Sequence, residues 1–254
     1  MMGTEESLKA ITRDDLEGFY KSHLSLDRAR IAVVGDLEGY DIKNLLEEAI
    51  GTISVCKVKD QVFPELMPIE PQVITKHMNR DQVVLMFACR SITRNHPDYS
   101  KLALFDRIFS GSMDSRLFKL RQRTGLFYSI SGTLVSNSDQ EPGLVLITTM
   151  VSLDRLEEAK KVIKETLGTV VDDITQEELD TAKRAYLAGR LNSYSLNFMI
   201  ASTFLYLDKF KLGDDFYDTM PAKLDLITLE DVKVAAKKVL VPEKIVTLQC
   251  GRFE

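Results

Sequence analysis

Two segments of this chain, one near each end, repeat the same order of residues at an offset of 216 positions. Residues 11–35 and residues 227–251 both open with Ile-Thr, continue through an acidic stretch to a lysine at the matching position, and end in a strand-like run closed by glycine. The threonine of each copy, Thr12 or Thr228, is a residue type that caps helix N-termini. Both copies are therefore predicted to be a capped helix followed by a short strand.

The second copy lies at the end of the chain, where it would close a domain. The first copy therefore predicts that the chain opens with the tail of one domain. We interpret residues 1–36 as the C-terminal tail of a missing first domain and residues 37–254 as a complete second domain of the same fold. The strand predicted at 29–35 would then expose an edge without its own sheet. We expect it to pair with a neighbouring chain or to fold back on the main sheet.

Between the two copies, predicted strands come first and predicted helices come later. A short helix is expected between Ser115, whose side chain or that of Asp114 would cap it, and Gly125, a residue type favoured just past a helix end. This order indicates an α+β fold, a two-layer sandwich in which helices cover one face of a largely antiparallel sheet. The other predicted elements are strands at 72–76, 83–89, 126–135, 144–151 and 244–250, and helices at 13–23, 41–50, 98–110, 153–171, 176–193, 197–211 and 229–240.

Composition excludes several classes of protein. The 254 residues carry a net charge of -5, and no run of Lys and Arg offsets it, which argues against a nucleic-acid-binding surface. No apolar stretch approaches the roughly 20 residues that span a membrane. The three cysteines, Cys56, Cys89 and Cys250, lie far apart, so buried free thiols are expected rather than disulfides. Free thiols favour a cytoplasmic protein.

The stretch 115–129 reads Ser-Arg-Leu-Phe-Lys-Leu-Arg-Gln-Arg-Thr-Gly-Leu-Phe-Tyr-Ser. It resembles the SRLF-x-x-LR-x-x-x-GLxY signature found in the second domain of each half-molecule of M16 (pitrilysin/insulinase/mitochondrial processing peptidase) metallopeptidases. Two further matches lie in the same order as in the family: the segment 15–36, from Asp-Leu to Val-Val-Gly-Asp, and the Thr-x-x-Glu-Leu-x-x-Ala-Lys start of a helix at 175–183. The resemblance covers nearly the whole chain.

This resemblance implies a zinc endopeptidase built from repeated domains, with the metal held by HxxEH in another domain or subunit. The family's substrate-side domain supplies an Arg and a Tyr, seven positions apart, that contact the substrate carbonyl, and they correspond here to Arg121 and Tyr128. A guanidinium and a phenol hydroxyl suit the negative charge that develops on that oxygen. Another interpretation is that Arg121 interacts with the helix C-terminus and Tyr128 packs on the sheet.

No HxxEH motif occurs in the chain. His23, His77 and His96 lie far apart and are interpreted as surface or capping residues, so no zinc is expected in this chain, and the chain alone should not hydrolyse peptides. Zinc is expected in the missing domain or in a partner subunit.

Weaker candidates surround the signature. Ser129, Ser131 and Gly132 follow Tyr128 on a predicted strand, which could pair with an extended substrate, although a plain sheet strand is the other interpretation. Gly111-Ser112 resembles the family's glycine-rich turn, or is an ordinary turn between helices. The acidic pairs 172–173 and 177–178 are interpreted as solvated helix ends.

Three hypotheses follow. The chain is the C-terminal, non-zinc-binding portion of an M16 endopeptidase acting on a peptide or small protein. Alternatively, it belongs to a non-catalytic subunit that supplies Arg121 and Tyr128 to a HxxEH-bearing partner. In the third, it is a structural relative like the core subunits of the respiratory bc1 complex. All three imply a homo- or hetero-oligomer or a second M16 domain.

Overall fold

The structure is a computed structural model that describes residues 3–57, 59, 62–192 and 194–253. The chain divides into two compact units, and each is described by itself. The first comprises Met1–Pro64 with Ser195–Tyr206, and the second comprises Glu65–Tyr194 with Leu207–Glu254.

The second unit is built on one five-stranded sheet with the order β1-β5-β2-β4-β3. Only β1 and β5 pair in parallel, and the three other pairings are antiparallel. The predicted largely antiparallel sheet is therefore confirmed. The strands are β1 (Val73–His77), β2 (Gln82–Arg90), β3 (Ser129–Ser136), β4 (Leu144–Ser152) and β5 (Val246–Gly251).

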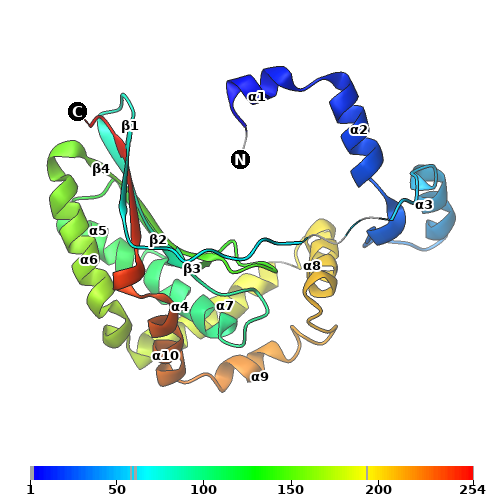
Figure 1. Ribbon diagram of the computed structural model, residues 1–254. Helices are drawn as coiled ribbons and strands as arrows, with labels where there is room; N and C mark the ends of the chain where they lie inside the picture. The colour runs from blue at the N-terminus through cyan, green and yellow to red at the C-terminus, as the bar shows by residue number, and fades with distance from the viewer. Residues whose placement is uncertain (1–2, 58, 60–61, 193, 254) are drawn as a thin grey trace. The chain divides into compact units, whose positions relative to one another are not determined.

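One face of this sheet forms the core. Along β2, burial alternates with the period of two that a strand requires, so that Val83, Leu85 and Phe87 are completely buried. Figure 1 shows the long helices on this one face, as the α+β prediction expects. These helices are α4 (Tyr99–Ser110), α5 (Arg116–Thr124), α6 (Leu156–Asp173), α7 (Gln176–Asn192) and α10 (Leu229–Val239), and a short α9 (Met220–Asp225) precedes α10.

Among its described residues, the first unit contains helices and no strand. It contains α1 (Glu5–Ala10), α2 (Arg13–His23), α3 (Ile42–Ile50) and the part of α8 (Asn197–Phe210) up to Tyr206. The expected Thr12 cap is confirmed, since the backbone N–H of Asp15 donates to its hydroxyl and the Asp15 carboxylate accepts from the Thr12 N–H at 2.9 Å. Thr228 caps α10 in the same way.

The strand predicted at 29–35 is not formed, which corrects the sequence analysis. These residues have no strand assignment, Gly35 is a bend, and the five strands of the sheet do not include them. The physical reason is that a strand exists only when a neighbour completes its hydrogen bonds. Among the described residues of the first unit there is no other strand to supply them.

Smaller differences have local causes. The strand expected from 126 begins at Ser129, because Leu126 and Phe127 are buried in the turn that follows α5. Gly125 takes the predicted left-handed conformation, with φ at 60°. Neither Asp114 nor Ser115 caps α5 through its side chain, since the Ser115 hydroxyl donates instead to the Ser112 carbonyl.

The three cysteines are free, but only Cys89 is buried. The short helices α1 and α9 were not predicted.

Strand β3 lies at one edge of the sheet, and α4 closes part of that edge. The backbone N–H of Gly132 donates to the Ser110 hydroxyl at 3.0 Å, and the N–H of Leu134 donates to the Asp106 carboxylate at 2.6 Å. The Thr133 hydroxyl also donates to Asp106. Burial raises the pKa of Asp106 from 3.8 to about 6, and these hydrogen bonds only partly offset the effect of burial.

This shift predicts how stability depends on pH. Because the pKa of Asp106 is higher in the folded state, its contribution to stability is full below pH 3.8 and is lost as the pH rises through about 6. Relative to the Asp106→Asn variant, the native chain should lose up to about 3 kcal/mol of unfolding free energy between pH 4 and pH 7. Urea unfolding of both proteins across this range measures the difference.

Asp98→Asn is the control with the opposite sign. Hydrogen bonds from Lys101 and Lys238 hold the pKa of Asp98 below its ordinary value, so the native chain should lose stability relative to that variant as the pH falls. An Asp106→Asn difference that stays constant between pH 4 and pH 7 would contradict the assignment.

Candidate functional site

The structure brings Arg121 and Tyr128 together at the start of the edge strand β3. Arg121 lies in the last turn of α5, as predicted, and Tyr128 directly precedes β3. The Arg121 Nε donates to the Tyr128 backbone carbonyl at 2.8 Å, and the guanidinium lies 5.7 Å from the centre of the Phe118 ring. This bond spans the Gly125 turn and holds the Arg121 guanidinium against the backbone of Tyr128.

The outer atoms of both side chains are available to a ligand. The Tyr128 side chain is 71% exposed, so the interpretation that it packs on the sheet is wrong. The Arg121 guanidinium is bonded to the Tyr128 carbonyl instead of a carbonyl at the end of α5. Within the described residues, its two terminal nitrogens and the Tyr128 hydroxyl have no hydrogen-bond partner. A cation and a neutral donor are thus presented together.

Ser129 and Ser131 continue this surface along β3. Both are exposed, and the Ser129 carbonyl accepts from the hydroxyl of Thr149, which is almost completely buried on β4. Thr149 was not recognised in the sequence, because nothing in its own neighbourhood indicates which carbonyl its hydroxyl reaches. Together with Arg121, Thr149 fixes two successive carbonyls at the start of the strand.

Gly132 has a clear packing role. A Cβ at this position would lie 2.4 Å from the Phe109 ring and 2.9 Å from Leu117, so the glycine lets β3 approach α4 and α5. Its N–H is already bonded to Ser110. An incoming strand would have to displace Ser110 to use this amide.

The remaining free edge of β3 is short. In a strand, residues two apart point their backbone groups to the same side. The Gly132 and Leu134 amides bond to groups outside the ladder, so the backbone groups of Ile130 face the same edge. The position between the Arg121 bond and the Ser110 bond is therefore where an extended peptide could pair.

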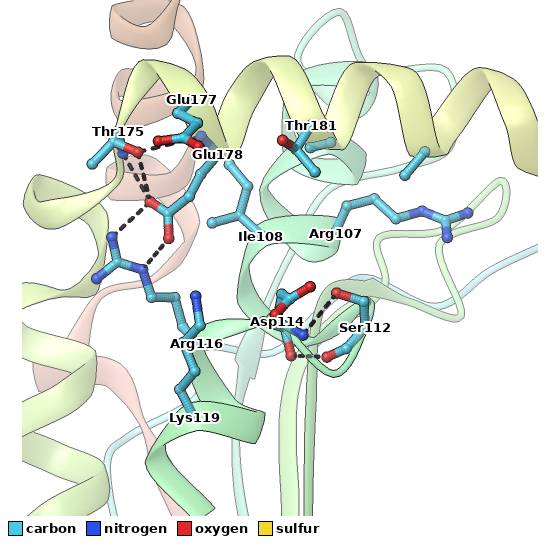
Figure 2. Close-up of a pocket in the computed structure, with 14 residues that line it drawn as sticks. Arg107, Ile108, Ser112, Asp114, Arg116, Lys119, Thr175, Glu177, Glu178 and Thr181 are labelled. Atoms are coloured by element: carbon cyan, nitrogen blue, oxygen red, sulfur yellow. Dashed lines mark hydrogen bonds and ion pairs between the residues drawn. The ribbon is translucent and has the colours of Figure 1, made fainter. Parts of the chain in front are cut away.

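A separate pocket of about 480 Å³ is lined by residues of α4, α5, α7 and the loops that precede α5 and α7. Figure 2 shows Arg116 and Glu178 bonded to each other on one side of it, with Arg107 on the other side. Neither Arg121 nor Tyr128 lines it. Its charged residues are three cations and three carboxylates, so it has no net preference for an anion or a cation. They are Arg107, Arg116, Lys119, Asp114, Glu177 and Glu178.

Glu178 is not the solvated helix end that the sequence suggested. Its carboxylate accepts two hydrogen bonds from Arg116, each at 2.6 Å, and a third at 2.9 Å from the backbone N–H of Thr175. Arg116 also donates to the Asp173 carbonyl. Two of the motifs found in the sequence, Ser115-Arg116 and Thr175-x-x-Glu178, thus meet in space. The Gly111-Ser112 turn lies beside them and lines the same pocket.

No metal site is found in the described part of the chain. There, no group of three or more His, Cys, Asp or Glu side chains could hold a metal ion. His96 accepts from the Asp98 N–H, His77 contacts the Phe253 carbonyl at 2.5 Å, and His23 stacks on Phe19. The zinc that the resemblance implies was expected in another domain or subunit, not among these residues. No helix in the described residues is long and apolar enough to cross a membrane.

Comparison with known proteins assigns the family. Residues 10–186 match the model described as the peptidase M16 inactive domain, which is more than half of the chain. The chain belongs to the M16 peptidase family. The resemblance predicted from the signature around Arg121 is thereby confirmed.

Two curated relatives are similar along most of the chain. It is 26% identical over 255 residues to the uncharacterised zinc protease YmxG of Bacillus subtilis strain 168, covering 98% of the chain and 60% of YmxG. It is 22% identical over 246 residues to the probable inactive metalloprotease YmfF of the same bacterium, covering 93% of the chain and 55% of YmfF. The chain thus spans little more than half the length of these M16 relatives.

The fold also resembles part of a longer M16 structure. The crystal structure of a peptidase M16 inactive domain from Pseudomonas fluorescens is similar with a TM-score of 0.81 and 23% identity, over 99% of this chain and 60% of that one. The predicted α+β fold is confirmed by this likeness and by the mixed sheet. The chain carries the inactive, C-terminal M16 domain of zinc-protease-like proteins.

The Arg116–Glu178 pair predicts a pH-dependent contribution to stability. Burial disfavours the Glu178 carboxylate, but Arg116 and the Thr175 N–H outweigh it and hold its pKa below the ordinary value of 4.5. Glu178→Gln should lower the unfolding free energy at pH 7 by about 1–2 kcal/mol, because Arg116 loses its charged partner. Urea unfolding should show this difference at pH 7 and its loss as the pH falls below 4.5 and through the lowered pKa of Glu178.

Glu177→Gln is the matched control, since Glu177 lies in the same turn of α7 and is exposed. It should change the unfolding free energy by no more than about 0.5 kcal/mol. Equal effects of the two substitutions would contradict a specific role for the ion pair.

Proposed function

We propose that this chain is the substrate-side part of an M16 zinc metalloendopeptidase and that it presents Arg121 and Tyr128 to a peptide bond held at a HxxEH site in another domain or subunit. One observation supports this most strongly. The Arg121 Nε bond to the Tyr128 carbonyl anchors the guanidinium while its outer nitrogens and the phenol hydroxyl stay available.

The chemistry of the two groups suits this role. Hydrolysis of a peptide bond by metal-activated water places negative charge on the carbonyl oxygen. Donors that are already in position stabilise such charge without reorganising at the moment of reaction. Arg121 would contribute a full positive charge, and Tyr128 would contribute one neutral hydrogen bond.

The neighbouring strand edge offers a way to hold the substrate. Ile130 faces the free edge between the Arg121 and Ser110 bonds, so an extended peptide could form main-chain hydrogen bonds there, with Ser129 and Ser131 beside it. Pairing through the backbone is independent of side-chain identity, which fits a peptide or small-protein substrate. Gly132 would support this edge by letting β3 pack closely on α4.

A second candidate is a non-catalytic M16 subunit that assembles with a HxxEH-bearing partner or has a structural role. The similarity to the probable inactive metalloprotease YmfF favours it. The two candidates differ in whether Arg121 and Tyr128 act in turnover, so kinetics separates them.

Substitution of each residue in the complete protein, or in its complex with the HxxEH-bearing subunit, tests the proposal. Arg121→Ala should lower kcat for a peptide substrate by roughly 10²–10³-fold, and Tyr128→Phe should lower it by at least about tenfold, because both donors act on the transition state. Steady-state kinetics on one peptide gives kcat and KM for each variant.

Arg123→Ala is the matched control. It lies on the same helix, is exposed, and forms no ion pair with a described residue. It should leave kcat within about twofold of the native protein. Native turnover in the Arg121 and Tyr128 variants would refute the role of these residues, and absence of turnover in the complete assembly would support the non-catalytic subunit.

A further inference from the structure

The two edges of the five-stranded sheet differ in how much of their backbone is free. At one edge, the Gly132 and Leu134 amides of β3 are bonded to side chains of α4. The other edge is β1 (Val73–His77), which pairs with β5 alone among the described strands. Every residue of β1 is exposed. The open edge of the sheet is therefore β1.

The backbone groups of β1 alternate between β5 and this free edge. The Thr247 N–H donates to the Gln72 carbonyl at 2.8 Å, and the Met78 N–H donates to the Gly251 carbonyl at 2.7 Å. Even-numbered residues of the segment therefore point their backbone groups toward β5, and odd-numbered residues point theirs away from it. No described residue bonds to the N–H and C=O groups that face the edge. These groups belong to Val73, Thr75 and His77.

Strand β1 is fixed in place along its whole length. Each of its residues is in register with a residue of β5. The Gln249 Nε2 also donates to the Thr75 hydroxyl at 2.8 Å, and the His77 ring contacts the Phe253 carbonyl. An edge held in this way does not have to be ordered when an extended chain adds to it, which lowers the cost of binding.

A hollow lies beside this edge, on the face of the sheet that the helices cover. Val73 pairs with Thr247 and Thr247 pairs with Phe87, so these three side chains lie on that face. The hollow has a volume of about 470 Å³, and the charges of Lys164 and Glu243, which also line it, offset each other. A residue added opposite Val73 would have its side chain on the side of this hollow. The apolar lining residues are Pro71, Val73, Phe87, Leu167, Pro242 and Ile245.

The edge also carries an excess of positive charge. Residues 72–80 include Lys76 and Arg80 and contain no Asp or Glu. The next carboxylate along the chain, that of Asp81, is paired with Arg252 at 3.1 Å, and neither Lys76 nor Arg80 has an ion pair within the described residues. Lys76 lies on the face opposite to Val73, because the two are three positions apart in a strand. An acidic residue opposite Lys76 would therefore form a cross-strand ion pair.

We propose that the free edge of β1 binds an extended peptide segment that carries an apolar side chain and, three residues away, an Asp or Glu. The main chain of this segment pairs with Val73, Thr75 and His77. Its apolar side chain lies beside Val73 next to the hollow, and its carboxylate lies opposite Lys76. The spacing of three follows because Val73 and Lys76 are three positions apart and lie on opposite faces.

This inference goes beyond the proposed function and does not rest on it. Arg121 and Tyr128 precede β3 at the other edge of the sheet, with β5, β2 and β4 between the two edges. Neither residue lines the hollow beside β1. The edge of β1 is thus a second, separate place where an extended chain can add.

Charge favours an acidic peptide over a second copy of the chain as the occupant. Two copies of β1 paired antiparallel about Thr75 would place Ile74 of each opposite Lys76 of the other. The two Lys76 side chains would then be diagonal neighbours on one face, where like charges repel. An acidic segment on the same edge would remove this repulsion and add an attraction.

A short peptide tests the proposal on the chain itself. The probe is acetyl-Glu-Thr-Thr-Leu-Thr-Thr-Glu-amide, which has the required spacing in whichever direction it runs along β1. At saturation it should slow the hydrogen exchange of the Val73, Thr75 and His77 amides by at least about tenfold, because these amides become hydrogen-bonded. The Ile130 amide on β3 should exchange as before. Nuclear magnetic resonance of the isotope-labelled chain resolves the individual amides.

Substitutions identify the edge and its charge, with calorimetry giving Kd. Thr75→Pro removes an N–H that faces the edge without removing a bond to β5, and should weaken the probe by at least about tenfold. Thr75→Ala is the matched control, since it keeps the N–H, and should change Kd by less than about threefold. Lys76→Glu should weaken the probe by roughly threefold or more and favour a version with Lys in place of Glu. Replacing the probe's Leu by Ser should weaken binding by about tenfold.

Other results overturn the proposal. Exchange at β1 that the probe does not slow, or equal affinity for the Glu and Lys versions, would do so, and neither result depends on how Thr75→Pro folds. A native chain whose mass in solution rises with its concentration, while that of Lys76→Glu rises more steeply, would show that a second copy is the occupant. Arg121→Ala should leave the affinity for the probe unchanged, so failure of the catalytic proposal would not be mistaken for failure of this one.

Discussion

Every second side chain of β2 is buried beneath the helices. This packing of β2 on the helices positions the elements around the candidate site. Full burial of Leu85 or Phe87 contributes about 1.5–3 kcal/mol each. Because β2 also pairs with β5 on one side and β4 on the other, its register sets the register of both neighbours. β3 pairs only with β4, and the candidate site lies at the start of β3.

Helix α4 both covers the core and limits the edge of the sheet. Its apolar residues belong to the core and pack against β3, while Asp106 and Ser110 accept hydrogen bonds from backbone N–H groups of β3. A carboxylate buried at this position is costly, but it leaves fewer unpaired amides on the edge strand. The part of the edge that stays free lies beside Arg121 and Tyr128, so the same helix that stabilises the sheet also restricts where a peptide could add.

The repeated segment shows how one local sequence behaves in two surroundings. The capping boxes at Thr12 and Thr228 are the same, because the groups that form them are three residues apart. The strand and the buried helix face occur only in the second copy, because they require partners from β1, β2, α4 and α6. Local structure is thus reproduced at both places, and tertiary structure only at one.

The sequence by itself determined the family, the α+β class and most helices, since these depend on periodicity, caps and motifs read within a few residues. It also placed Arg121 in the last turn of its helix and the left-handed conformation at Gly125. Tertiary structure decided that Glu178 pairs with Arg116, that Gly132 is needed for packing on α4, and that residues 29–35 form no strand. Each of these depends on contacts between residues that are far apart in the chain, and a local sequence pattern does not predict such contacts.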